Sequence, residues 1–212
     1  MGKRIAIHAN PSLTHQVDIA HALYKGGIGN VTYAPDTQAD IHIVIGPWFA
    51  LRQWRFSNTL YIDRAYWGDP DHVSVHWLQN GEKVRTKNNP YRWHPNLKPM
   101  KKGTRRLYLC DYACKPDGEY ETVRYHPAQI RPLRPLIDDL NCHDVAIGRR
   151  TTALVDAAIH GLQIETSDPN SPVYGIIDRE QWACDLAWHN WSLIEIESGA
   201  LFNALGTTNP SN

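Results

Sequence analysis

Short apolar runs separated by polar turns fill the first half of the chain and predict a series of strands. The runs cover residues 3–10, 30–35, 39–46, 59–63 and 72–78. The run at 39–46 is apolar almost throughout, which is typical of a strand in a parallel sheet covered on both faces. After the first run, residues 14–27 carry apolar positions at helical spacing and end in two glycines. That pattern predicts an amphipathic helix with a glycine C-cap.

The second half of the chain resumes the alternation after an irregular segment. Apolar patterns predict strands at 105–113 and 120–126, and a further apolar run stops at Gly148. A turn and a stretch of helix formers follow, and a second apolar run begins after Gly161. The remaining chain predicts two helices whose starts fit capping boxes, formed by Asp178 with Gln181 and by Ser192 with Glu195.

Alternating strands and helices predict an α/β protein with parallel sheets and right-handed crossovers. We expect two Rossmann-like halves with a cleft between them and C-terminal helices that cross back to the first half. The predicted domains are residues 1–105, which include a basic segment at 83–106, and residues 106–212. Ligands of such folds bind at the carboxyl ends of the strands.

Composition restricts the function only broadly. The 212 residues carry a net charge of zero, so any affinity for nucleic acid must come from a local patch. The chain has no leading apolar segment with a cleavage site and no apolar run of membrane-spanning length, which predicts a cytoplasmic protein without a membrane partner. Its cysteines lack paired spacing and are expected to be free thiols: Cys110, Cys114, Cys142 and Cys184.

The turn after Gly148 has the residues of a phosphate-binding site. A glycine allows close backbone approach, and a helix start attracts anions through its unpaired N–H groups. Hydroxyl and guanidinium groups can add hydrogen bonds to phosphate oxygens, and four such residues follow here: Arg149, Arg150, Thr151 and Thr152. The alternative is an ordinary helix start with two solvated arginines.

Two further residues fit a nucleotide. His126 follows a predicted strand of the same half and can donate a hydrogen bond to a phosphate. Asp156 lies one helical turn beyond the threonines, where a carboxylate can accept hydrogen bonds from ribose hydroxyls. The alternatives are a turn histidine and a polar residue on an exposed helix face.

The stretches "YHP" and "GRRTTALVDAAIHGLQIETSDPNSP" resemble the donor-binding half of glycosyltransferases with the GT-B fold. The resemblance implies phosphate binding by His126, Thr151 and Thr152, ribose binding by Asp156, and a contact of Asp168 with the sugar. The chain is also similar to small bacteriophage glycosyltransferase-like proteins, in which an acidic-Arg-Gly-Tyr-Phe-Gly-Asp stretch corresponds to "DRAYWGD" here. The usual acidic residue on the ribose helix of that fold is Glu, and here it is Asp.

A transferase needs a group that takes a proton from the acceptor hydroxyl. Asp63 with Arg64 is the first candidate, because both end a predicted strand within "DRAYWGD". His15, at the start of the first predicted helix, is the second candidate and could equally serve only the helix start. Asp69 is expected to cap a turn. No DxD motif follows a predicted strand convincingly, so we expect no essential metal and no cofactor besides the nucleotide sugar.

The basic segment at 83–106 contains nine Lys or Arg residues and no Asp or Glu. Aromatic residues interrupt the charges, a combination that suits a nucleic-acid backbone with an extruded base. The predicted contacts are Lys83, Arg85, Lys87, Arg92, Trp93, Lys98, Lys101 and Lys102. The alternative is a solvated linker between domains.

Together these features predict a glycosyltransferase that moves a sugar from a nucleotide-sugar donor to a hydroxyl acceptor. The favoured acceptor is a hydroxymethylated pyrimidine in phage DNA, and the protein would then work in the host cytoplasm. Two alternatives stay open. One is a transferase acting on a small molecule or a surface glycan, and the other is a catalytically idle module that binds nucleotide and DNA.

Overall fold

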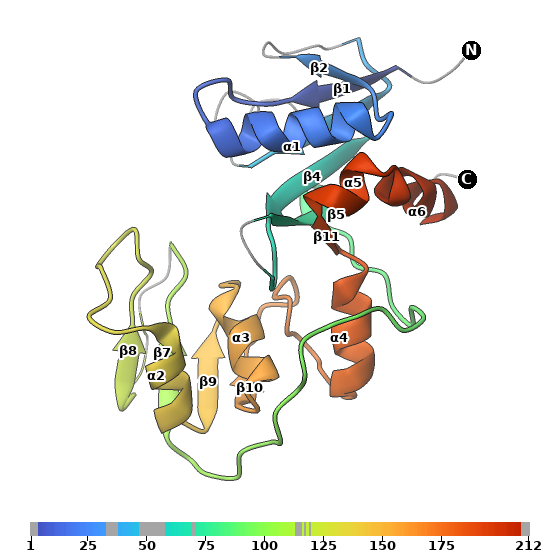
Figure 1. Cartoon of the computed structure of the whole chain (residues 1–212). Coiled ribbons are helices and arrows are strands. Elements are labelled where there is room, and N and C mark those ends of the chain that lie inside the picture. Colours follow the sequence, from blue (N-terminus) through green and yellow to red (C-terminus); the bar gives the residue numbers. More distant parts are fainter. Residues whose placement is uncertain are drawn as a thin grey trace. The chain divides into compact units, whose positions relative to one another are not determined.

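The computed structural model describes residues 4–32, 38–46, 58–68, 71–112, 116, 118 and 120–208. The chain forms two compact units (Figure 1). The first unit consists of Met1–Lys87 and Ala187–Asn212, and the second of Asn88–Leu186. Each unit contains a sheet with helices, so the protein is of the mixed α/β class predicted from the sequence.

The boundary between the units differs from the expected position at residue 105. Residues 88–105 belong to the second unit because their backbone is bonded to it. The Lys98 N–H donates to the Ile159 carbonyl at 2.9 Å, and the Lys101 N–H donates to the Gly161 carbonyl at 2.8 Å. The first unit is completed by the last part of the chain, so it is discontinuous in sequence.

The first unit contains a mixed seven-stranded sheet. Six of its strands follow the order β11-β5-β4-β3-β1-β2, and the seventh, β6, pairs with β5. Four neighbouring strands, β2, β1, β3 and β4, run parallel, and β5, β6 and β11 are antiparallel to their neighbours. The strands are β1 (Ile5–His8), β2 (Asn30–Thr32), β3 (Ile41–Ile45), β4 (Thr59–Arg64), β5 (His72–Gln79), β6 (Glu82–Lys83) and β11 (Asn190–Ser192).

One face of this sheet is apolar and forms the core of the first unit. Because side chains alternate between the faces, Ile7, Ile43, Ile62, Val75 and Trp191 all lie on that face. They pack with residues of α1 (Thr14–Lys25), α5 (Leu193–Glu197) and α6 (Ala200–Thr208).

The other face of the same sheet is polar, yet it is buried. The same alternation places hydroxyl, amide and imidazole groups there: His8, His42, Thr59, Ser74, His76 and Asn190. Buried polar groups are normally held by hydrogen bonds. His8 and His42 illustrate this, since Nε2 of one lies 3.1 Å from Nδ1 of the other.

The second unit contains a four-stranded sheet in which all neighbours are parallel, in the order β10-β9-β7-β8. Its strands are β7 (Arg106–Leu109), β8 (Thr122–Arg124), β9 (Val145–Gly148) and β10 (Gln163–Glu165). Its helices are α2 (Leu136–Cys142), α3 (Ala153–Ile159) and α4 (Arg179–Ala187). The last residue of α4, Ala187, is the residue at which the chain returns to the first unit.

The two sheets share one arrangement of parallel strands. Within each unit, the second parallel strand in chain order lies on one side of the first, and the third and fourth lie on the other side. The chain therefore reverses its direction across each sheet at the first strand, β1 or β7. In α/β folds, such a reversal marks the usual place for a ligand.

The predicted helix starts are confirmed in part. Ser192 and Glu195 form the reciprocal capping box at the start of α5. Asp178 accepts the N–H groups of Glu180 at 2.9 Å and Gln181 at 3.1 Å, but the Gln181 side chain does not return the bond. Its amide instead donates to the carbonyl of Asn89 at 3.0 Å. The end of the chain also contains β11 and α6, which the sequence pattern did not predict.

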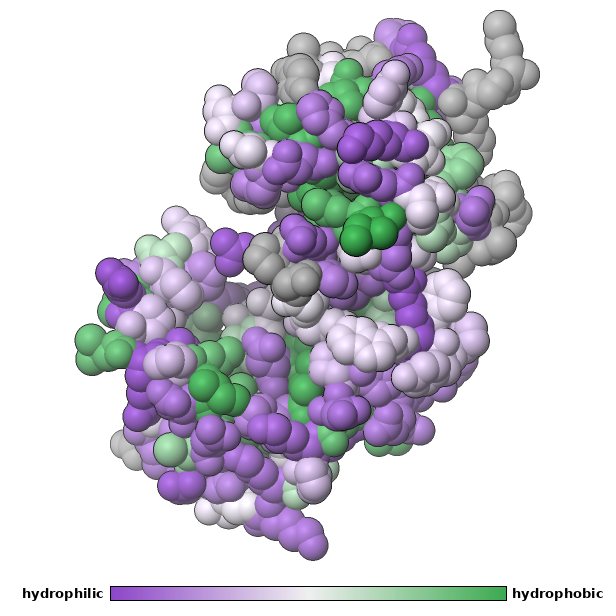
Figure 2. All heavy atoms as spheres, viewed as in Figure 1, coloured by the Kyte–Doolittle hydropathy of each residue, from purple (hydrophilic) through white to green (hydrophobic). Residues whose placement is uncertain are grey.

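None of the helices in the described part of the chain has the length and apolar character of a bilayer span. On the face seen in Figure 2, hydrophilic residues predominate and apolar residues form small separate patches. Scattered apolar residues of this kind are normal on protein surfaces.

Candidate functional site

The carboxyl edge of the second sheet gathers most of the predicted nucleotide-binding residues. The chain reverses across this sheet at β7, which has β8 on one side and β9 on the other. His126 follows the end of β8, and the turn at 149–152 follows the end of β9. Two strand spacings separate these strands, so the ends of β8 and β9 lie about 10 Å apart along the edge. A nucleoside diphosphate can span that interval.

The ring of His126 is fixed as a hydrogen-bond donor. Its Nδ1 lies 3.2 Å from the N–H of Ala128 and accepts that bond. A neutral imidazole that accepts at Nδ1 carries its proton on Nε2. The ring of Tyr112 meets it edge-on, with 5.9 Å between centroids. His126 can therefore donate its Nε2 proton to an oxyanion at this edge.

Tyr112 is a candidate that sequence reasoning missed. It lies just beyond β7, at the strand where the chain reverses, and its side chain is exposed. The Gln129 amide donates to its carbonyl at 2.8 Å and holds the backbone beside His126. An exposed aromatic ring here can stack on a base or a sugar. In the sequence, the position of Tyr112 directly after an apolar run was the available indication of this role.

Gly148 allows β9 to pack closely against β7. A Cβ on this residue would lie 2.6 Å from the Leu109 carbonyl oxygen, so a larger residue would push β9 away from β7. At the start of α3, the Thr151 hydroxyl accepts the Ala153 N–H at 3.3 Å. Thr152 makes no side-chain cap, and its side chain is exposed. Its hydroxyl can therefore meet a phosphate oxygen.

Both arginines of this turn contact Asp168. The Oδ2 of Asp168 lies 2.6 Å from Arg150 Nε and 3.4 Å from Arg149 Nη2. The side chain of Asp168 is buried, and its Oδ1 accepts the Asn170 N–H at 2.9 Å. The Arg150 hydrogen bond is the main cause that holds the pKa of this carboxyl below its usual value. Asp168 thus anchors the turn, where the resemblance implied a contact with the sugar.

Asp156 has a different environment. Its side chain is partly buried on α3, and its carboxylate has no hydrogen-bond partner among the described residues. Burial raises the pKa of this carboxyl to about 6. A partly buried carboxylate without a partner costs stability, and such groups occur preferentially at functional sites.

The predicted base in the first unit is an ion-paired carboxylate. Asp63 lies on β4, and its Oδ2 is 3.1 Å from Lys83 Nζ. The same ammonium lies 5.3 Å from the centre of the Tyr61 ring. Arg64 and His15 are exposed, at the end of β4 and the start of α1 respectively. Asp69 falls outside the described residues.

A buried network of aromatic and imidazole groups lies near Asp63. The Tyr66 hydroxyl donates to His76 Nε2 at 3.0 Å, and His76 Nδ1 donates to the Val84 carbonyl at 3.2 Å. The ring of His76 stacks on His189, with 4.3 Å between centroids. Burial, reinforced by His189, lowers the pKa of His76 to about 2, and burial raises the pKa of Tyr66 to about 12. Both groups therefore stay neutral near pH 7.

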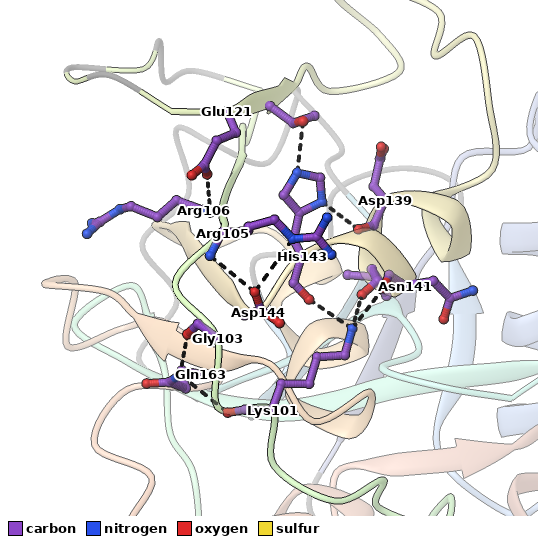
Figure 3. Close-up of polar contacts among 12 residues, drawn as sticks. Lys101, Gly103, Arg105, Arg106, Glu121, Asp139, Asn141, His143, Asp144 and Gln163 are labelled. Atoms are coloured by element: carbon purple, nitrogen blue, oxygen red, sulfur yellow. Dashed lines mark hydrogen bonds and ion pairs between the residues drawn. The ribbon is translucent and has the colours of Figure 1, made fainter.

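Some of the lysines predicted to bind DNA contact other groups of the protein, and others have exposed side chains. Lys101 Nζ lies 2.6 Å from the Leu140 carbonyl oxygen, 2.8 Å from that of His143 and 3.2 Å from that of Asn141 (Figure 3). These carbonyls end α2, so Lys101 is a helix cap. Lys98 Nζ lies 2.6 Å from His160 Nε2.

Residues 98–105 run along the amino edge of the second sheet. The Gln163 amide at the start of β10 donates to the carbonyls of Lys101 and Gly103, at 3.3 and 3.1 Å (Figure 3). Arg105 donates its N–H to Asp144, just before β9, at 3.2 Å. The edge that carries His126 lies at the opposite ends of these strands. This part of the basic segment is therefore separated from the candidate nucleotide site by the length of the sheet.

Another part of the basic segment offers exposed side chains. Tyr91 is 75% exposed and Trp93 is 62% exposed. Lys87 is exposed as well, and so is Lys102 within residues 98–105. Arg85 is partly buried and forms a hydrogen bond with Tyr66.

No described group of three or more His, Cys, Asp or Glu side chains is arranged to hold a metal ion. Cys110, Cys142 and Cys184 are free thiols, and Cys114 lies outside the described residues. No protein-family model, curated protein or solved structure matches this chain, so its own residues carry the evidence for its function.

Proposed function

We propose that the chain is a nucleotide-sugar-dependent glycosyltransferase built from two Rossmann-like halves. The repeated order of parallel strands supports the two halves. The second unit would bind the nucleotide at the carboxyl edge of its sheet, because the chain reverses there. The first unit would contribute the acceptor side and the base.

The residues of the second unit take separate roles in this proposal. His126 Nε2 and the hydroxyl of Thr152 donate to the phosphates, and Tyr112 covers one side of the site. Asp156 accepts hydrogen bonds from the ribose hydroxyls. Arg149 and Arg150 shape the turn through Asp168. The observation that carries the proposal is the unpartnered, partly buried carboxylate of Asp156 on α3, the helix that begins at this edge.

The transfer itself needs a base and a leaving group. The acceptor oxygen forms a bond to the anomeric carbon as the bond from that carbon to the diphosphate breaks. The nucleoside diphosphate leaves with the bonding electrons, and His126 stabilises its negative charge. Asp63 takes the acceptor proton, and Lys83 holds the carboxylate in place.

The direct test is calorimetric titration with UDP, GDP, CDP, ADP and dTDP. One of them should bind, and His126→Ala should weaken binding by about tenfold, the worth of one charge-assisted hydrogen bond. His21→Ala makes the same change at an exposed histidine of the first unit and is the matched control. If no nucleoside diphosphate binds the folded protein, the proposed function is wrong.

A second candidate is a nucleotide-binding module without turnover. The Asp63–Lys83 ion pair favours it, because the carboxylate expected to act as the base is already engaged by an ammonium. The two candidates differ in one measurement. The transferase releases nucleoside diphosphate from the nucleotide sugar when acceptor is present, whereas the module binds the nucleotide sugar and releases none.

For the acceptor, we propose DNA that contains a hydroxymethylated pyrimidine. The exposed rings of Tyr91 and Trp93 and the exposed Lys87 in the same stretch of sequence support this choice, since stacking rings and cations together suit nucleic acid. The set of residues proposed to contact DNA is smaller than the set predicted from the sequence, because Lys83 and Lys101 are bound to other groups of the protein. A small-molecule or glycan acceptor remains the alternative if DNA does not bind.

A further inference from the structure

The start of α1 is a helix N-terminus at the place where the chain reverses across the first sheet. β1 leads into this helix, and β1 lies between β2 and β3. The helix has 12 residues, its N-cap residue Leu13 has no capping side chain, and its first turn has no acidic residue. The N–H groups of Thr14 and His15 have no partner in the described part of the chain. This end of α1 therefore retains its positive partial charge.

A buried amide group reaches the same place. Gln16 is only 2% exposed, and its Oε1 accepts the N–H of Asn10, just beyond β1, at 2.9 Å. Its Nε2 faces the end of β3, because a Cβ on Gly46 would lie 2.6 Å from it. This Nε2 has no hydrogen-bond partner among the residues that the structure describes. A donor on a buried side chain that lacks a partner in the protein is available to a ligand.

We propose that the start of α1 binds a phosphate group. The donors are the N–H groups of Thr14 and His15, the Thr14 hydroxyl and Nε2 of Gln16. The exposed ring of His15 can add a further donor, a role different from the base predicted for it. The amide oxygens of Asn10 and Gln16 already accept backbone N–H groups, those of Ser12 at 3.0 Å and of Asn10 at 2.9 Å respectively. A set composed of donors suits a phosphate and repels a metal ion.

The phosphate can belong to a small molecule or to a nucleic-acid backbone, and the chemistry at α1 is the same. The site belongs to the first unit, whereas the proposed nucleotide site belongs to the second. It therefore does not depend on the proposed glycosyltransferase activity.

The test is a nuclear magnetic resonance titration of the isotope-labelled full chain with inorganic phosphate at constant ionic strength. The backbone N–H signals of Thr14 and His15 and the side-chain amide signal of Gln16 should shift together and saturate. A nucleoside monophosphate and a short oligodeoxynucleotide form two further arms. The arm that saturates at the lowest concentration identifies the source of the phosphate. Absence of shifts at these signals with all three ligands would overturn the proposal.

Gln16→Glu is the informative variant. It keeps an oxygen for the Asn10 N–H but replaces the donor with a negatively charged acceptor, so phosphate affinity should fall by about tenfold or more. Gln79→Glu makes the same change at the opposite edge of the sheet and should bind like the wild type. Thr151→Val with Thr152→Val should also leave the α1 signals unchanged. If that pair abolishes the shifts at α1, the phosphate binds in the second unit and the proposal is wrong.

Discussion

The ammonium of Lys83 lies 3.1 Å from the carboxylate of Asp63. The sequence assigned these residues to separate tasks, DNA binding and proton transfer. Their ion pair places both in one cluster with the Tyr61 ring. Lys83 is therefore better suited to hold a carboxylate than to meet a phosphate backbone.

The first prediction separates the two tasks. Asp63→Asn should leave nucleotide affinity unchanged and lower sugar transfer by about two to four orders of magnitude, the usual effect of losing a general base. Lys83→Met should also lower transfer but leave DNA affinity unchanged, because its ammonium is already paired. Lys87→Met, at an exposed side chain nearby in the sequence, should lower DNA affinity and leave sugar transfer unchanged. Sugar-transfer assays and fluorescence anisotropy measure the two effects, and normal transfer by Asp63→Asn would move the base elsewhere.

The second prediction concerns Asp156 and pH. Since burial raises the pKa of this carboxyl to about 6, the folded state binds a proton more tightly than the unfolded state. Wild-type stability should therefore fall as the pH rises from about 4 to 6 and level off above that range. Asp156→Asn should stabilise the protein by about 1–3 kcal/mol above pH 6 and have little effect near pH 4.

Urea unfolding across this pH range measures the Asp156 effect, with the exposed Asp138→Asn as control. The same Asp156→Asn variant should bind nucleotide less tightly, because a neutral amide is a poorer acceptor for ribose hydroxyls. A variant that gains no stability at pH 8 would show that the carboxylate has a partner in the folded protein.

The third prediction distinguishes two neighbouring lysines. Lys101→Met removes a group that meets three carbonyls at the end of α2, so the free energy of unfolding should drop by about 1–3 kcal/mol. Lys102→Met, at an exposed side chain, should change it by less than about 0.5 kcal/mol. Equal effects in urea unfolding would contradict the capping role.

The fourth prediction tests the DNA acceptor. If about four phosphates are contacted, affinity should weaken several tens-fold between about 50 and about 200 mM salt. Lys87→Gln with Lys102→Gln should reduce this dependence, whereas Trp93→Ala should leave it unchanged and lower transfer to the extruded base. Anisotropy with duplex and single-stranded DNA, with and without hydroxymethylated pyrimidines, provides the measurement. DNA that fails to bind at low salt would leave a small-molecule or glycan acceptor.

The local pattern of the sequence predicted most of the strands and the capping of α5. Such features depend on residues close together in the chain, such as Ser192 and Glu195, whose hydrogen bonds are completed within one helical turn. The turn at Gly148 was predictable for the same reason, since an apolar run that stops at a glycine before a stretch of helix formers indicates a strand end.

The contacts that decide the roles of side chains could not be read from the sequence. Lys101 became a cap only because the end of α2 lies beside it, and His76 stacks on a histidine that arrives with the returning chain. The partners of Arg150 and Lys83 could not be identified from the sequence either. Charge alone predicted that these residues bind something, but the folded backbone determines which anion is nearest.

The discontinuity of the first unit has a consequence for synthesis on the ribosome. β5 pairs with β11, yet the whole second unit is translated between them. At about 5–20 residues per second, the nascent first unit waits on the order of 5–20 s for that strand. During this interval part of β5 is an unpaired edge, which can join strands of other chains. The second unit, translated without interruption, can finish folding first and leave the sheet of the first unit to close last.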